Sequence, residues 1–132
     1  MKRKIGRLIY LASPYTDEDF AIQEQRWKQA CAATAHFIQR GYIVYCPIAH
    51  CHPIDIAARG TITYDQWIEH SDTMLALCNV LYVLMLKGWV KSNGVAGEIE
   101  KAKQQSMPIL YVDPRGYKTF TGPQIEAQGE QK

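Results

Sequence analysis

Three features of the sequence predict a single α/β domain built on a doubly wound parallel sheet. Short apolar runs alternate along the chain with longer amphipathic segments, which is the pattern of strands joined by helices. The run at residues 80–86 (VLYVLML) has the length and the composition of a buried parallel strand. The chain of 132 residues is long enough for one domain with a sizeable core. We therefore expect a flavodoxin- or Rossmann-like fold with helices on both faces of the sheet.

The first third of the chain reads as strand, helix, strand. Residues 8–12 (LIYLA) form the first expected strand. Residues 16–19 resemble a capping box and open a long helix that ends at Gly41. The inner face of this helix is marked by side chains at helical spacing, namely Trp27, Cys31, Thr34, Phe37 and Ile38. Residues 42–46 (YIVYC) form the second expected strand.

The rest of the domain begins with a segment that we interpret as irregular, residues 48–64, with room for a short helix over residues 53–58. The next expected elements are a helix over residues 65–77, the strand 80–86, a helix that begins near Ser92 and Asn93, and a strand over residues 108–112 (PILYV). The inner side of the helix over residues 65–77 comprises Trp67, Ile68, Ser71, Met74, Leu75 and, just after it, Cys78. We assign residues 1–114 to the domain. Residues 115–132 are polar and rich in Gly and Gln, so we expect a loose C-terminal tail.

Composition and charge limit the classes of partner. A net charge of +2 without a strongly basic patch argues against binding to a nucleic-acid polymer. The longest apolar run is far shorter than the roughly 18 residues of a membrane span, and no signal peptide is recognisable, so we expect a cytoplasmic protein with no membrane partner. In that compartment the four cysteines are expected to be reduced. The spacing of Cys46, His50, Cys51 and His52 does not match a structural zinc pattern, and we expect neither a metal nor another cofactor.

The candidate chemistry centres on Glu98. Ser92 can cap the helix that follows the longest apolar strand, which places Glu98 one turn into that helix. Open α/β sheets bind ligands at the carboxyl ends of their strands, and the loop over residues 10–15 lies at the same edge of the sheet. Cleavage of a glycosidic bond needs a nucleophilic carboxylate, a second carboxylic acid and a group that orients the nucleophile. Asp65 and Asp72, on the preceding helix, are the candidates for the second acid.

Three motifs are shared with a known superfamily. Residues 10–14 (YLASP) are similar to its opening Tyr-x-Ala-Gly-Pro loop, with Ser13 in place of the glycine. Asp72 and the apolar residues after it are similar to its aspartate-bearing helix. Residues 92–102 are similar to its polar-x-Gly-x-x-x-Glu-x-Gly-x-Ala signature. On these motifs the chain resembles the nucleoside 2-deoxyribosyltransferase superfamily, which includes deoxynucleoside 5'-monophosphate N-glycosidases.

The resemblance implies a role for each matched residue. Glu98 would be the nucleophile that forms a deoxyribosyl-enzyme intermediate, and Tyr10 would hold its carboxylate in line. Asp72 would bond to the departing base and assist its protonation. Ser92 stands where relatives acting on free nucleosides have an aspartate and relatives acting on 5'-monophosphates have a serine. This serine favours a nucleotide substrate, because an aspartate would repel the phosphate.

Further residues are candidates for contacts with the substrate. Ser13, Pro14 and Gly94 belong to the loops that the resemblance places around the sugar or phosphate. His50 either bonds to the backbone or lines the site, and Trp89 either stacks on a base or packs in the core. The direction of the helix over residues 65–77 favours Asp65 as the group near the base, since this helix starts at the carboxyl end of the sheet. The resemblance favours Asp72, which we choose.

The leading hypothesis is an enzyme that breaks the N-glycosidic bond of a deoxynucleoside or its 5'-monophosphate and passes the sugar to water or to another base. The alternatives are a non-catalytic nucleotide-binding or sensing domain on the same fold and a redox module that uses the cysteines; no Cys-x-x-Cys pair supports the latter. The sequence does not choose between hydrolase and transferase and does not name the base. A homodimer or larger homo-oligomer is expected, because a small sheet cannot bury all of Trp27, Phe37 and Trp67.

Overall fold

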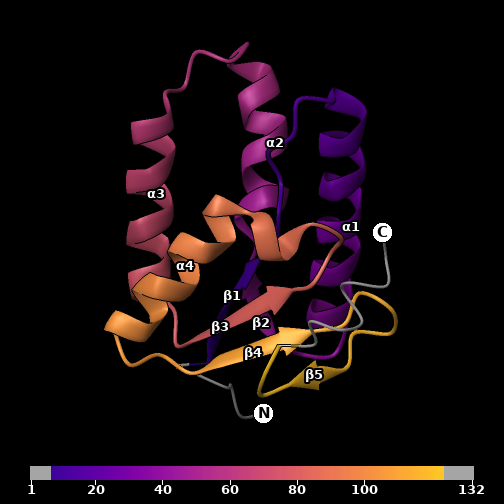
Figure 1. The fold of residues 1–132 in the computed structure, drawn as a ribbon, viewed down its shortest axis with the longest axis vertical. Helices are drawn as coiled ribbons and strands as arrows, with labels where there is room; N and C mark the ends of the chain where they lie inside the picture. The colour runs from indigo at the N-terminus through magenta and orange to yellow at the C-terminus, as the bar shows by residue number, and fades with distance from the viewer. Residues whose placement is uncertain (1–6, 124–132) are drawn as a thin grey trace.

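The computed structural model describes residues 7–123, and its centre is a five-stranded sheet of order β2-β1-β3-β4-β5 (Figure 1). The strands are β1 (Leu8–Ala12), β2 (Ile43–Tyr45), β3 (Val80–Leu84), β4 (Ile109–Val112) and β5 (Thr119–Phe120). The first four run parallel, and β5 pairs antiparallel with β4. This arrangement confirms the expected α/β fold with a mostly parallel sheet.

The sheet separates two apolar clusters, and each is covered by helices. On one face, α1 (Phe20–Gln39) packs Ala30, Ala33 and Phe37 against alternate residues of the strands, and α2 (Pro47–Ala57) adjoins the same cluster. On the other face lie α3 (Tyr64–Leu77) and α4 (Asn93–Gln104). All five residues of β3 are buried, because neighbours pair with both of its edges and helices cover both of its faces.

Local capping chemistry fixes where the helices begin. The Ser92 hydroxyl accepts the backbone N–H of Val95, so α4 starts where the sequence predicts. Thr63 and Gln66 form a capping box that starts α3. The prediction of a capping box at residues 16–19 is wrong: α1 begins at Phe20, and its cap is the Asp19 carboxylate, which accepts the N–H of Ala21.

Three other expectations are corrected by the structure. The segment interpreted as irregular contains α2, which starts directly after β2 and runs through Pro53 instead of starting there. Part of the expected tail is ordered structure, since Thr119–Phe120 forms the edge strand β5. Residues 124–132 of that tail lie outside the described residues. On α1, Ile38 is 53% exposed and does not belong to the inner face.

Helices α2 and α3 extend past the sheet at the top of Figure 1. The Trp67 indole N–H of α3 donates a hydrogen bond of 3.2 Å to the Asp55 carboxylate of α2, which ties the two helices together there. Since α2 follows the carboxyl end of β2, this pair of helices stands over the sheet edge at which ligands are expected.

Candidate active site

Tyr10 and Glu98 form the centre of the candidate site. Tyr10 lies in β1 and is fully buried, and its hydroxyl donates a hydrogen bond of 2.5 Å to Oε2 of Glu98. Glu98 lies one turn into α4, where the cap at Ser92 places it. Its residue is half-buried as a whole. The structure therefore brings together two of the three predicted catalytic residues from segments 88 positions apart.

Burial dominates the electrostatics of this pair. Desolvation raises the pKa of Glu98 from its ordinary 4.5 to about 7, against the hydrogen bond from Tyr10 and the charge of Lys101, which favour the ionised form. The negative charge of Asp72 adds to the rise. Burial, reinforced by the charge of Glu98, raises the pKa of Tyr10 far above neutrality, so this phenol stays a hydrogen-bond donor. A carboxyl group that titrates near neutrality is typical of functional sites.

Asp72 lies beside this pair, as the third predicted catalytic residue. Its Oδ1 forms an ion pair with Nζ of Lys101, one turn after Glu98 on α4. Both partners are partly exposed. Ser71, the residue before Asp72, lies next to the Tyr10 phenol. The charges at this contact between α3 and α4 therefore alternate in sign: the positive Lys101 lies between the carboxylates of Asp72 and Glu98.

Asp65 is placed differently. It is exposed in the first turn of α3, seven residues before Asp72, which is about 10 Å along a helix. The charges that act on Glu98 come from Lys101 and Asp72. Of the two rival carboxylates, the structure brings only Asp72 to the Tyr10–Glu98 pair.

The loops at the carboxyl ends of β1 and β3 hold most of the other candidates. Ser13 is 4% exposed, and within residues 7–123 its hydroxyl has no hydrogen-bond partner; Pro14 is also buried. Ser92 is half-buried, and its hydroxyl oxygen accepts a hydrogen bond from the N–H of Val95. A Cβ at Gly94 would lie 3.8 Å from that hydroxyl oxygen, which is an ordinary contact, so space alone does not require a glycine.

Trp89 is in the core. Only 6% of its surface is exposed, and its ring centroid lies 5.7 Å from that of Tyr111. This placement favours packing, the second of the two roles considered for Trp89, over stacking on a base.

His50 belongs to an aromatic cluster that adjoins Tyr10. The exposed His50 ring stacks on His70 with centroids 5.1 Å apart and planes 6° apart. Tyr45 lies 5.7 Å from His50 and 5.7 Å from Tyr10, measured between ring centroids. Within the described chain, the Tyr45 hydroxyl and Nε2 of His70 are buried without a hydrogen-bond partner. Such groups are costly to leave unpaired, so they are strong candidates for contacts with water or a ligand.

A hollow of about 310 Å³ adjoins this cluster along α3. Its lining comprises Gln66, Glu69, His70, Thr73 and Met74. Tyr45 and His70 are not among the residues predicted from the sequence, because one lies inside a strand and the other inside a helix. The signal that would have found Tyr45 is its position at the end of β2, which pairs with β1 beside Tyr10.

Arg26 holds the two loops of the site together, and it too was missed. Its guanidinium donates to the carbonyl oxygens of Tyr15 and Thr16 after β1, at 3.4 and 3.0 Å, and to that of Lys87 after β3, at 3.3 Å. Gly88 leaves room for this contact: a Cβ there would lie 2.8 Å from Nη2 of Arg26, and its φ of +91° is unfavourable for other residues.

The described part of the chain holds neither a cluster of metal ligands nor a helix that could span a membrane. Within residues 7–123, no three or more His, Cys, Asp or Glu side chains are grouped to hold a metal ion. None of the helices there has both the length and the apolar content needed to cross a membrane.

A family model described as a domain of unknown function, DUF1937, matches residues 7–113. The chain belongs to this family. The match spans β1 to the residue after β4, and therefore every residue of the candidate site. No curated protein matches the chain significantly.

Proposed function

We propose that this protein cleaves the N-glycosidic bond of a 2'-deoxynucleoside 5'-monophosphate, or of the deoxynucleoside, through a glycosyl-enzyme intermediate on Glu98. The observation that carries the proposal is the 2.5 Å hydrogen bond from Tyr10 to Glu98, with Asp72 within electrostatic range of the same carboxylate. The sequence motifs similar to nucleoside 2-deoxyribosyltransferases support it independently, since they comprise the same three residues.

The geometry suits a displacement at the anomeric carbon. Tyr10 uses its proton to hold Oε2 of Glu98, which leaves the other carboxylate oxygen for attack. As the bond from the sugar to the base breaks, its electron pair moves to the base nitrogen, and Asp72 assists protonation there. Because the pKa of Glu98 is about 7, the fraction of the carboxyl group that is ionised and nucleophilic increases as the pH rises through this value. The charge of Lys101 favours this ionised form.

The substrate class follows from Ser92 and the cluster around His50. The N-terminus of α4 attracts anions, and a serine at its cap adds no negative charge that would repel a phosphate. The Tyr45 ring lies 5.7 Å from that of Tyr10, and within the described residues the Tyr45 hydroxyl and Nε2 of His70 have no partner, so a base with donors and acceptors would pair with them.

The proposal extends to the setting of the enzyme. We place it in the cytoplasm, without a cofactor, as a homodimer or larger homo-oligomer. The expected reason for assembly needs correction, because Phe37 is only 5% exposed. Tyr64, Leu77 and Ile43 are 75, 65 and 59% exposed, the highest values among the large apolar side chains of the described residues, and an interface would cover side chains of this kind.

The test is chromatography of reactions with a panel of deoxynucleosides and their 5'-monophosphates, with and without an acceptor base. Wild-type protein is expected to release or exchange a base. Glu98→Gln keeps the shape of the side chain and should lose about a thousandfold or more in turnover. Glu100→Gln, an exposed glutamate of the same helix, is the matched control and should retain activity. Binding of nucleotides without any turnover would instead indicate the non-catalytic alternative.

A further inference from the structure

Lys101 links the two carboxylates of the candidate site, and the proposed function does not depend on it. Its Nζ forms an ion pair with Oδ1 of Asp72, which joins α4 to α3. Lys101 also follows Glu98 by one turn of α4. Side chains at this spacing lie on the same face of a helix, with about 5–6 Å between their Cβ atoms. Lys101 is therefore a neighbour of Glu98 within α4 and of Asp72 across the contact between the two helices.

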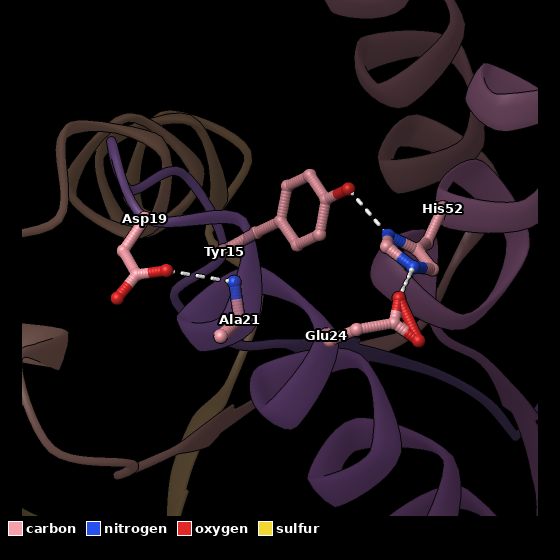
Figure 2. Close-up of polar contacts among 5 residues, drawn as sticks. All are labelled: Tyr15, Asp19, Ala21, Glu24 and His52. Carbon is pink, nitrogen blue, oxygen red and sulfur yellow. Dashed lines mark hydrogen bonds and ion pairs between the residues drawn. The ribbon is translucent and has the colours of Figure 1, made fainter.

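A second pair of a carboxylate and a basic side chain, Glu24 with His52, offers a comparison. Nε2 of His52 lies 2.9 Å from the Glu24 carboxylate, and Nδ1 lies 2.5 Å from the Tyr15 hydroxyl (Figure 2). This pair joins α1 to α2, the helices on the other face of the sheet. Among residues 7–123, none of the side chains whose charges or hydrogen bonds shift the pKa of Glu98 belongs to this group.

The charge of Lys101 counteracts a repulsion between the two carboxylates of the site. Like charges at close range disfavour each other, so one of two neighbouring carboxyl groups tends to keep its proton. Burial has the largest effect on Glu98 and raises its pKa to about 7, and the negative charge of Asp72 adds to this rise. The hydrogen bond from Tyr10 and the charge of Lys101 oppose it. Of these two opposing groups, only Lys101 carries a charge.

The other titratable groups that face Glu98 are neutral near pH 7. Cys51 of α2 and Tyr45 of β2 are within electrostatic range of its carboxyl group. Burial, reinforced by neighbouring groups, raises the pKa of the Cys51 thiol to about 12 and raises that of the Tyr45 phenol as well. The Tyr10 phenol of β1 also keeps its proton, because burial raises its pKa. The ion pair between α3 and α4 therefore provides the charges that act on Glu98 at neutral pH.

We propose that Lys101 is a positioning residue of the site, which keeps Glu98 ionised for attack while the carboxylate of Asp72 lies close to it. This inference rests on the proposed function and adds a residue to its machinery. Lys101 acts through the two carboxylates, because its single positive charge attracts both. Without this charge, Glu98 would keep its proton to a higher pH, and a protonated carboxyl group is not a nucleophile.

The experiment measures the ionisation of Glu98 directly and without a substrate. The protein is labelled with ¹³C at the side-chain carboxyl groups of Glu and titrated by NMR, and the Glu98 signal is assigned as the one that Glu98→Gln lacks. Wild-type protein should titrate with a midpoint of about 7. Lys101→Met keeps most of the aliphatic stem and removes the charge, so the midpoint should move upward by about one pH unit.

Further variants test the sign of each charge. Asp72→Asn removes the charge that disfavours ionisation of Glu98, so the midpoint should move downward, and the double variant with Lys101→Met should lie between the two single ones. Lys101→Arg keeps the positive charge and should retain the wild-type midpoint. Lys103→Met, at an exposed position of α4, and Glu24→Gln, in the pair between α1 and α2, are the matched controls and should leave the Glu98 midpoint unchanged.

Turnover of a deoxynucleoside monophosphate that the wild-type protein cleaves provides a readout that a structural role would not give. With an upward shift of about one unit, Lys101→Met should lose about tenfold in kcat/KM at pH 6 and less than about twofold at pH 9, where Glu98 is almost fully ionised in both proteins. A variant whose structure is damaged would lose a similar factor at both pH values. Lys101→Arg should restore the wild-type pH profile.

Each outcome bears on one of the two proposals. If the Glu98 midpoint in Lys101→Met is unchanged from wild type, the role of Lys101 is refuted, whether or not the protein cleaves a nucleotide. A loss of turnover that is equal at pH 6 and pH 9 also refutes it. If the wild-type protein releases no base from any member of the panel, the proposed function fails, whereas an upward shift in Lys101→Met still supports Lys101 as the residue that keeps Glu98 ionised.

Discussion

The replacement of Glu98 by Gln tests the electrostatics of the site without any substrate. Folding raises the pKa of this carboxyl group from 4.5 to about 7, chiefly by desolvation. The folded state therefore binds a proton that the unfolded chain releases between these two values. The stability provided by this proton is fully present below pH 4.5 and is lost as the pH rises to about 7. Gln does not titrate, and its amide oxygen can still accept the hydrogen bond from Tyr10.

The magnitude follows from the size of the shift. One pKa unit corresponds to about 1.4 kcal/mol, so a rise from 4.5 to about 7 is equivalent to about 3 kcal/mol. Because the residue is half-buried, screening by solvent reduces the expected effect to about 2 kcal/mol. Glu98→Gln should thus be about as stable as wild type at pH 4 and about 2 kcal/mol more stable above pH 7.5.

The assay is urea denaturation from pH 4 to pH 9 at constant ionic strength, with the midpoint and slope recorded for each protein. Glu100→Gln, at an exposed position two residues further along α4, serves as the control and should follow the wild-type curve. A constant difference between Glu98→Gln and wild type across this range would refute the assigned pKa. If Glu98→Gln became less stable than wild type as the pH rises, the ionised carboxylate of the wild-type protein would be favourably paired.

Three other predictions concern substrate choice, the second acid and assembly. A deoxynucleoside monophosphate should be processed better than its nucleoside. Ser92→Asp should reverse part of this preference, since a like charge near the phosphate costs on the order of 1 kcal/mol. Equal use of both substrates by the wild-type protein would contradict the role of Ser92. Asp72→Asn should lose base release while Asp65→Asn retains it, both with normal melting, and the opposite result would show that Asp65 is the acid. Light scattering at micromolar concentration should show at least a dimer, and a 15.1 kDa particle would contradict the expected interface.

The elements that the sequence predicted well are those specified by their own residues. β3 is a run of apolar residues buried on both faces, and α4 starts at Ser92 because the cap needs only that hydroxyl and the N–H of Val95. The pairing of Tyr10 with Glu98 was predictable in outline, because adjacent parallel strands end at the same edge of a sheet.

Only the second half of α2 was predicted, as a possible short helix over residues 53–58, and its start at Pro47 was missed because the helix has a polar residue on its buried side. His52 is 1% exposed, whereas Ile54 and Ile56 are 38 and 53% exposed, so a search for apolar residues at helical spacing finds the wrong face. Pro53 lies inside the helix and lacks the N–H that would continue the ladder. Contacts of His52 with Tyr15, Glu24 and Trp27 on other elements hold this segment, and none of these contacts is visible in the local sequence.

The direction of α3 alone was insufficient to predict which of Asp65 and Asp72 lies near Glu98. The 14 residues of α3 are about 21 Å long, whereas the 5 residues of β3 span about 17 Å. Only Cys78 and Asn79 separate the two elements, so the excess length of α3 lies at the carboxyl end of the sheet and extends past it. Asp65, in the first turn, is therefore beyond the strand ends, and Asp72, about 10 Å further along the helix, is level with the strand interior. Tyr10 pairs with Leu81 at that level, so a carboxylate in the middle of α3, not at its start, is the one that lies beside Glu98.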